Sequence, residues 1–200
     1  MARENIAVFG AGLSGRAAAV LARERGAGVT VFDEAGGGDA VVFGAEAARA
    51  FDRFVFSPGF PAAHPWRRAA AATGRPCVGE TAFAAAHWGG RLLGVTGTNG
   101  KTTATSLLRA ALEAAGETAS EAGNMGRPLS ELAVSRKRAE AEWAVCEISS
   151  FQAELPAGLA LDGLLWTNFA EDHLDRYATA EAYFSVKRNL LDCLKPGAPW

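Results

Sequence analysis

The sequence predicts an α/β fold with two doubly wound parallel sheets, one in each half of the chain. Short apolar runs typical of buried strands alternate with alanine-rich runs that have the length of helices. Two glycine-rich turns each link such a strand to such a helix, which is the arrangement of a parallel βαβ unit. Of the 200 residues, 49% are hydrophobic, which is enough for a proper core and argues against disorder.

The first half contains one complete βαβ pattern. We expect strands at residues 6–9 and 28–33, separated by a turn at 10–15 and a helix over 16–25 that Gly26 ends. The other elements expected in this half are a loose loop at 35–39 with three consecutive glycines, a strand at 54–56, and helices at 65–73 and 81–88.

The second half begins after two consecutive glycines, and we place a domain boundary between residues 89 and 90. A fresh strand starts at Leu92, and a glycine-rich turn leads from it into a helix over 104–115, which Gly116 ends. The remaining expected elements are strands at 143–148 and 163–168 and a helix at 179–194.

The turn at residues 94–103 reads Gly-Val-Thr-Gly-Thr-Asn-Gly-Lys-Thr-Thr and is the most informative segment. A glycine-rich turn before a helix presents backbone N–H groups to phosphate at the positive end of the helix dipole. We expect Lys101 to reach the terminal phosphates and the Thr102 hydroxyl to bind Mg²⁺. The spacing differs from the common G-x-x-x-x-G-K-[ST] pattern, because Val95 stands where its first glycine would be. We therefore predict a variant P-loop.

The turn at residues 10–15 matches the dinucleotide fingerprint of Rossmann-like units, with Asp33 where a ribose-binding acid belongs. This match is weak on its own, because a tight turn without any ligand can have the same sequence. A second loop, Ser-Pro-Gly at 57–59, follows another strand and would line the same crevice. We expect this half to bind a phosphate-bearing ligand, and the motif does not identify it as NAD.

Three polar residues of the second half are candidates for the chemistry. Glu147 lies at the end of a strand, where a carboxylate can hold the metal that bridges phosphates. His173 lies in a dense run of acids and is a candidate to bind a divalent metal or orient a phosphate, with a structural histidine as the alternative. Lys187 has apolar neighbours, and from these residues alone a surface lysine is favoured over an amine of lowered pKa.

Charge and composition exclude several classes of partner. The formal net charge of −2 gives no electrostatic case for nucleic acid or an anionic membrane. No apolar run reaches the length of a membrane-spanning helix, and the N-terminus has no signal-peptide pattern. The cysteines at 77, 146 and 193 fit no metal or redox spacing and indicate a reducing compartment. We expect a cytoplasmic monomer.

The segments at 94–103, 147–152 and 168–177 together resemble those of the Mur ligase family, which builds the peptide stem of bacterial cell-wall precursors. The first segment shares that family's departure from the common loop spacing. Relatives that add a diamino acid typically have Ser-Ser-His where this chain has Ser-Ser-Phe at 149–151. The resemblance covers essentially the whole chain and is strongest to members that add D-glutamate to UDP-N-acetylmuramoyl-L-alanine.

The resemblance implies ATP, two Mg²⁺ ions, a UDP-linked substrate and an acyl-phosphate intermediate. The residues it implies at the ATP phosphates are Gly97, Thr98, Asn99, Gly100, Lys101, Thr102 and Thr103. Those implied at UDP-N-acetylmuramoyl-L-alanine are Gly12, Leu13, Ser14, Asp33, Ser57, Pro58, Gly59, Asn124, Ser149, Gln152 and His173. Those implied at the metals are Thr102, Glu147, His173 and Lys187, the last as a carbamate. Those implied to be catalytic are Lys101, Glu147, His173 and Lys187.

The resemblance also implies how the chain divides. Residues 1–89 would bind the UDP-linked substrate, although the loop at 35–39 lacks the polar residues that grip uracil in relatives. Residues 90–200 would form an incomplete ATP-binding domain, and the domain that captures D-glutamate would be absent. We therefore expect these 200 residues alone not to be a competent ligase. Three alternatives remain open: a nucleotide- or UDP-sugar-binding module without turnover, an NAD-dependent oxidoreductase module, and a family member with a folate or diamino-acid acceptor.

Overall fold

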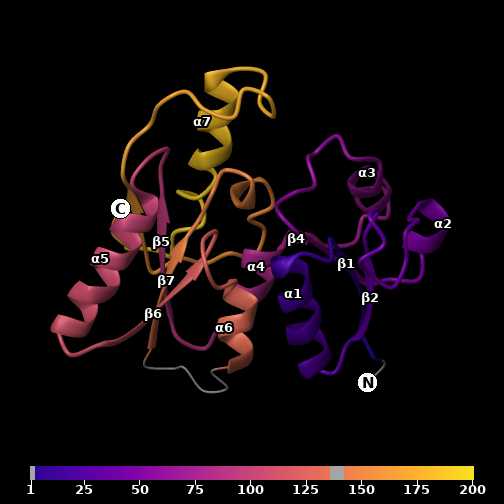
Figure 1. The fold of residues 1–200 in the computed structure, drawn as a ribbon, viewed down its shortest axis with the longest axis horizontal. Helices are drawn as coiled ribbons and strands as arrows, with labels where there is room; N and C mark the ends of the chain where they lie inside the picture. Colours follow the sequence, from indigo (N-terminus) through magenta and orange to yellow (C-terminus); the bar gives the residue numbers. More distant parts are fainter. Residues whose placement is uncertain (1–2, 136–141) are drawn as a thin grey trace.

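Two four-stranded parallel sheets form the framework of the molecule (Figure 1), which we describe from a computed structural model over residues 3–135 and 142–200. The first sheet has the strand order β2-β1-β3-β4, and the second has the order β6-β7-β5-β8. Every strand pairing described in them is parallel. The predicted α/β class with parallel sheets is therefore confirmed.

Helices and strands alternate along both halves. The elements of the first half are, in order, β1 (Asn5–Phe9), α1 (Leu13–Glu24), β2 (Gly28–Phe32), α2 (Ala45–Ala48), β3 (Arg53–Phe56), α3 (Pro65–Ala71), β4 (Cys77–Gly79) and α4 (Glu80–Ala85). Those of the second half are β5 (Arg91–Thr96), α5 (Lys101–Ala114), β6 (Thr118–Gly123), α6 (Leu129–Ser135), β7 (Glu142–Glu147), the 3₁₀ helix η1 (Gln152–Glu154), β8 (Gly163–Trp166) and α7 (Ala180–Arg188). None of the helices in these described ranges is long and apolar enough to cross a membrane.

Several predicted helix ends were wrong, and α4 ends three residues early. Both α1 and α5 begin three residues earlier than expected, so each glycine-rich turn leads directly into its helix. A Cβ on Gly15 would lie 1.8 Å from the Gly10 carbonyl oxygen, so glycine there lets the first turn of α1 pack on the loop. Helix α7 ends six residues early, because the chain beyond it pairs with residue 161 through a bond from Leu161 N–H to Cys193 O.

The sequence analysis missed β4, β6, α2, α6 and η1. Strand β6 is an edge strand that reads Thr-Ala-Ser-Glu-Ala-Gly, and only its last two residues are buried. Helix α2 has four residues and β4 has three. Short or weakly apolar elements leave too little periodicity to be detected in a single sequence.

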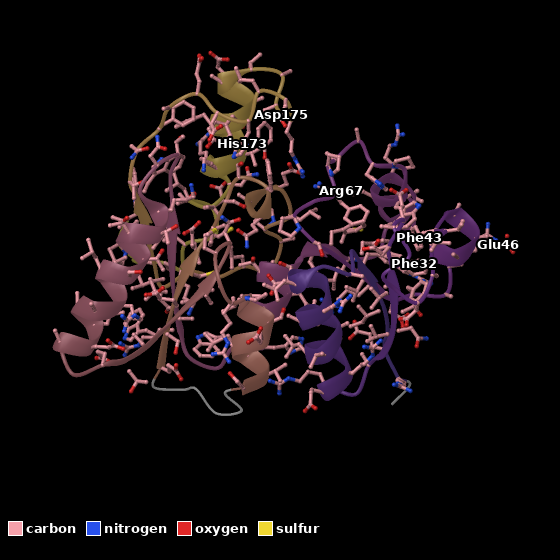
Figure 2. All side chains as sticks on the ribbon, in the orientation of Figure 1. Phe32, Phe43, Glu46, Arg67, His173 and Asp175 are labelled. Atoms are coloured by element: carbon pink, nitrogen blue, oxygen red, sulfur yellow. The ribbon has the colours of Figure 1, made fainter. Side chains whose placement is uncertain are left out.

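Two apolar clusters form the core. An aromatic cluster lies within the first half, where the rings of Phe9 and Phe56 stack at 4.2 Å and where Figure 2 labels Phe32 and Phe43. The other cluster crosses between the halves, and α1 and α6 lie side by side at its centre in Figure 1. Its members include Ile6, Val8 and Leu21 of the first half and Leu129, Leu132 and Ala144 of the second. The second cluster is therefore a hydrophobic core that the two sheets share.

The glycine-rich turns follow inner strands of both sheets. Strand β1 lies between β2 and β3, and β5 lies between β7 and β8. The chain leaves each of these strands toward one side of its sheet and later returns on the other side. Open α/β sheets bind ligands at such points, outside the carboxyl ends of the strands.

Candidate functional site

The loop at residues 97–100 joins β5 to α5. Gly97 and Gly100 have φ angles of 137° and 76°, in the region that favours glycine. A Cβ on Gly97 would lie 2.0 Å from Thr167 Oγ1, so the loop backbone packs directly on the residues that follow β8. Gly100 is the N-cap of α5 and supplies no side-chain cap, which leaves the first N–H groups of the helix for an anion.

Thr167 and Asn168, directly after β8, support this loop. Thr167 Oγ1 donates to Asn99 O at 2.7 Å, and Asn168 Nδ2 donates to the same oxygen at 3.0 Å. In return, the Asn99 N–H donates to Asn168 Oδ1 at 3.0 Å. The sequence analysis gave neither residue a role, and the available signal was their position after a strand of the same sheet. These three contacts therefore support the shape of the loop.

Lys101 and Thr98 complete the loop. Lys101 Nζ donates to Thr98 O at 2.8 Å, so the ammonium lies over the loop backbone. Thr98 is buried, and its hydroxyl donates to Ala170 O and accepts from Ala170 N–H, both at 3.0 Å. Thr102 and Thr103 are exposed at the start of α5. The predicted phosphate ligands therefore lie along one continuous surface of loop and helix.

Glu147 meets Thr102 and Asn124 beside the loop. Thr102 Oγ1 donates to Glu147 Oε2 at 2.7 Å, and Asn124 Nδ2 donates to Oε1 at 2.9 Å. Glu147 is only 2% exposed. Among residues 3–135 and 142–200 no ion pair involves it, and the two side chains that donate to it are neutral. A buried carboxylate in this setting favours a cation, and its hard oxygen atoms suit Mg²⁺.

Lys187 of α7 is buried beside the same loop. Its Nζ donates to Gly97 O at 2.7 Å and lies 5.0 Å from the centre of the Tyr183 ring. Burial, and after it the charge of Lys101, lower the pKa of Lys187 to about 8. The interpretation of Lys187 as a surface lysine was wrong, because the side chain is only 1% exposed and α7 turns it toward the loop.

His173 lies on the segment between β8 and α7, and Figure 2 shows it with Asp175 beside that helix. Its φ angle of 52° is uncommon for a residue other than glycine. Its Nε2 lies 3.7 Å from Asp172 Oδ2, and its ring lies 4.7 Å from that of Phe151. In the described ranges no group of three or more His, Cys, Asp or Glu side chains is placed to hold a metal ion. Of the predicted metal ligands, Thr102 and Glu147 are thus hydrogen-bonded to each other, whereas His173 lies on the separate segment between β8 and α7.

Asp33 ties together the turns that follow β1 and β2. Its Oδ2 accepts the Ala11 N–H at 2.6 Å, and its Oδ1 accepts the Ala35 N–H at 2.8 Å. These two backbone bonds hold the pKa of Asp33 below its usual value. Both oxygens of the predicted ribose-binding acid therefore already accept backbone hydrogen bonds, which the sequence did not reveal.

The start of α1 is open at the surface. Gly12 is the N-cap without a side-chain bond, and a Cβ there would meet no atom within 4 Å. Leu13 is 62% exposed, and Ser14 is half-buried. The first N–H groups of this 12-residue helix are thus accessible to an anionic group.

The loop of Ser57, Pro58 and Gly59 follows β3 beside that turn. Ser57 Oγ is buried and has no hydrogen-bond partner within the described part of the chain. A Cβ on Gly10 would lie 2.8 Å from this oxygen, so the two loops are in close contact. A Cβ on Gly59 would meet nothing within 4 Å. A buried hydroxyl without a partner, beside open backbone, is consistent with a ligand or water site.

Ser149 and Gln152 connect the two halves. The Ser149 N–H and Oγ donate to Gln152 Oε1 at 2.9 and 3.0 Å. Gln152 Nε2 donates to Thr81 Oγ1 of α4 at 2.9 Å. All three residues are buried, so their side chains are engaged with one another. Their predicted contact with substrate stays a prediction.

The fold and the loop at residues 97–100 together define a class of protein. In the second sheet an inner strand leads through a glycine-rich loop into a helix, and the neighbouring strand of the sheet ends in a buried carboxylate. This arrangement is typical of a nucleotide-binding α/β protein of the P-loop type. The sequence pattern of the Mur ligase middle domain matches residues 95–198. The chain belongs to the Mur ligase family, whose members are ATP-dependent amide ligases.

Curated relatives match most of this chain. The UDP-N-acetylmuramoylalanine--D-glutamate ligase of Gloeobacter violaceus is 38% identical over 206 residues, which cover 93% of this chain and 46% of that protein. The enzyme of the same name from Anaeromyxobacter dehalogenans is 39% identical over 207 residues, which cover 96% of this chain and 44% of that protein. The chain therefore spans less than half the length of these relatives.

Solved structures share the fold at lower identity. The UDP-N-acetylmuramate:L-alanyl-gamma-D-glutamyl-meso-diaminopimelate ligase of Neisseria meningitides superposes with a TM-score of 0.59 at 19% identity, over 98% of this chain and 70% of that chain. The UDP-N-acetylmuramate-alanine ligase MurC of Thermotoga maritima has a TM-score of 0.52 at 19% identity, over 96% of this chain and 48% of that chain.

Proposed function

We propose that this chain carries the nucleotide-phosphate site and the first-substrate site of an ATP-dependent ligase that joins D-glutamate to UDP-N-acetylmuramoyl-L-alanine. The observation that carries the proposal is the bond between Thr102 and Glu147 beside the glycine-rich loop, which brings a hydroxyl and a carboxylate to a phosphate-binding turn. The names of relatives at 38% and 39% identity support the two substrates.

The nucleotide end of the proposal follows from the loop. The backbone N–H groups of Gly100 and of the first turn of α5, together with the Lys101 ammonium, bind the anionic oxygens of ATP. Because Thr167 and Asn168 already hold the loop, little ordering has to accompany binding. Thr102 and Glu147 fit one Mg²⁺ ion, which when bound would neutralise charge on the phosphates.

A second Mg²⁺ site, held by His173 and a carbamate on Lys187, is the finer part of the proposal. A pKa of about 8 leaves a substantial neutral fraction of Lys187 near physiological pH. Only the neutral amine attacks CO₂; a nitrogen–carbon bond forms, one proton is released, and an anionic oxygen ligand replaces a cation. Burial beside Gly97 O supports this role.

The UDP-linked substrate is assigned to the first half, at the turns that follow β1, β2 and β3. The open N-terminus of α1 and the unsatisfied Ser57 hydroxyl support this assignment. In the proposed reaction, the L-alanyl carboxylate attacks the γ-phosphorus of ATP and ADP leaves. The amine of D-glutamate then attacks the acyl phosphate, and phosphate leaves. The two halves orient these groups and exclude water that would hydrolyse the acyl phosphate.

Calorimetric titration with UDP-N-acetylmuramoyl-L-alanine, and separately with NADH, tests the first site. We expect saturable binding of the UDP compound, and we expect Ser14→Trp to weaken it by blocking the start of α1. Glu117→Trp places the same side chain on an exposed turn after α5 and serves as the control. Binding of NADH without binding of the UDP compound would reject the ligase assignment and favour the oxidoreductase alternative.

A further inference from the structure

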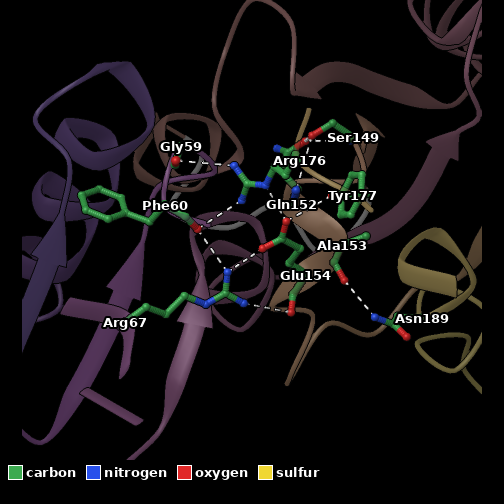
Figure 3. A network of polar contacts seen from close by, with 10 residues as sticks. All are labelled: Gly59, Phe60, Arg67, Ser149, Gln152, Ala153, Glu154, Arg176, Tyr177 and Asn189. Atoms are coloured by element: carbon green, nitrogen blue, oxygen red, sulfur yellow. Dashed lines mark hydrogen bonds and ion pairs between the residues drawn. The ribbon is translucent and has the colours of Figure 1, made fainter. Parts of the chain in front are cut away.

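A buried carboxylate lies between two arginines where the two halves meet (Figure 3). Glu154 Oε2 accepts from Arg67 Nη1 at 2.5 Å, and Oε1 accepts from Arg176 Nε at 2.7 Å. Tyr177 OH donates to Oε1 at 3.1 Å. The side chains of Glu154 and of both arginines are 8%, 12% and 12% exposed, so solvent screens these charges little. Arg67 belongs to α3 of the first half, and the other three residues belong to the second.

The same two arginines hold the loop that follows β3. Arg67 Nη1 and Arg176 Nη2 each donate to Phe60 O at 3.1 Å. This carbonyl comes directly after Gly59, in the loop that we assign to the UDP-linked substrate. One arginine from each half therefore meets at a single oxygen of that loop.

Arg176 also belongs to the turn that carries His173. The N–H groups of Arg176 and Tyr177 both donate to His173 O at 3.0 Å. The Arg176 guanidinium lies 4.2 Å from the centre of the Phe151 ring, and that ring contacts His173 at 4.7 Å. A displacement of Arg176 would therefore displace the backbone of His173.

We propose that Glu154 is a positioning residue which, through Arg67 and Arg176, fixes the His173 turn against the substrate loop of the first half. The proposal rests on the function proposed above, in which the first half holds the UDP-linked substrate and the second holds ATP. The substrate carboxylate must reach the γ-phosphate, so the offset between the halves decides whether the reacting groups meet. Other polar links between the halves run from Ser130 N–H to Glu80 Oε1, from Gln152 Nε2 to Thr81 Oγ1 and from Gly79 N–H to Leu155 O, and none of these three includes a residue of the His173 turn.

Hydrogen exchange tests the positioning without any ligand. Arg67→Met removes the Glu154 partner that comes from the first half. We expect exchange at the Arg176 and Tyr177 amides to become about tenfold faster, because these amides report whether the His173 turn is held. The amides of β5 keep their protection. Arg67→Lys retains the charge and one donor, and is expected to restore part of the protection.

Arg53→Met is the matched control, since it removes the ion pair of another first-half arginine, with Glu4. It should leave exchange at Arg176 and Tyr177 unchanged. If Arg67→Met leaves these two amides unchanged, the proposal is overturned. A uniform acceleration over all amides also overturns it, because it would show only a loss of global stability.

Glu154→Gln tests the link to function in the chain as it stands. The affinity for UDP-N-acetylmuramoyl-L-alanine is measured with and without a non-hydrolysable ATP analogue and Mg²⁺. We expect the analogue to raise this affinity about fivefold in the unmodified chain and not in Glu154→Gln. For each ligand alone, the affinity of Glu154→Gln is expected to stay within about twofold of that of the unmodified chain. An enhancement equal in both, or absent from the unmodified chain, overturns the proposal. Failure of the unmodified chain to bind the UDP compound overturns the proposed function, while the exchange result still decides whether Glu154 positions the turn.

Discussion

Lys187 combines nearly complete burial with an ionisable amine, which makes stability depend on pH. Its pKa of about 8 lies below the ordinary lysine value of 10.5, so the unfolded chain binds the proton more strongly than the folded chain does. The free energy of unfolding therefore rises with pH between about 8 and 10.5. Lys187→Met lacks this rise. We expect the stability of the unmodified chain relative to the variant to increase by roughly 2 to 4 kcal/mol across that window in urea titrations.

Lys195→Met is the control for this experiment, because Lys195 is half-exposed and pairs with Asp162 at the surface. Its stability difference should stay nearly flat over the same window. A flat difference for Lys187→Met as well would contradict the buried, partly neutral amine.

Gly97 and Gly100 show two different reasons for glycine in the loop between β5 and α5. Both have positive φ angles, but a Cβ on Gly97 would also lie 2.0 Å from Thr167 Oγ1, whereas one on Gly100 meets nothing within 4 Å. We expect Gly100→Ala to cost about 1 kcal/mol of stability from backbone strain alone. Gly97→Ala should cost about 2 to 4 kcal/mol, because it also displaces the residues that support the loop.

Urea unfolding and titration with an ATP analogue check this pair. Gly97→Ala is expected to lose nucleotide binding, since Thr167 can no longer hold Asn99. Equal losses of stability in the two variants would show that the contact with Thr167 does not determine the loop.

The sequence predicted the glycine-rich turn before α5 well and the burial of Lys187 poorly, for a physical reason. Gly97 to Thr103 form a local motif, so their spacing alone defines a turn before a helix. The apolar residues next to Lys187 in the sequence would be the same whether its helix were half-exposed or fully buried. Which face of α7 meets the loop between β5 and α5 depends on tertiary packing, and without the family resemblance the surface alternative was favoured.

Glu80, the first residue of α4, lies against the start of α6. It is 1% exposed, and its Oε1 accepts the Ser130 N–H at 2.8 Å. Burial raises the pKa of Glu80. Because the folded pKa lies above the unfolded one, its stabilising contribution is present below the unfolded value and is lost as the pH rises through the folded value. Glu80→Gln keeps an acceptor for Ser130 and cannot ionise, so we expect it to be more stable than the unmodified chain at pH 8 and not at pH 5.

Chemical unfolding at pH 5 and at pH 8 measures this gain in stability. Glu131→Gln, which changes an exposed glutamate of α6, controls for a general effect of removing a carboxylate. A loss of stability at both pH values would mean that the charge on Glu80 is needed.

The supports around the site were beyond the sequence because they join distant segments. Asn168 is 69 residues from Asn99, and Arg67 is 87 residues from Glu154. Neither pairing has a local signature, and strand β6, whose loop supplies Asn124, is too polar to be detected. The sequence could predict where most of the strands end, but it could not predict which of these ends face each other.

The shared core argues that the two halves unfold together, although the sequence suggests a boundary between residues 89 and 90. Leu132 of α6 is fully buried in the cluster that also contains Ile6 and Leu21 of the first half. We expect Leu132→Ala to cost about 2 to 5 kcal/mol. In hydrogen exchange measured in urea, the protection of β1 and β7 should fall together, whereas Leu107→Ala, on an exposed position, should change neither. If β7 loses protection while β1 keeps it, the halves are independent units and the core between them does not couple their stability.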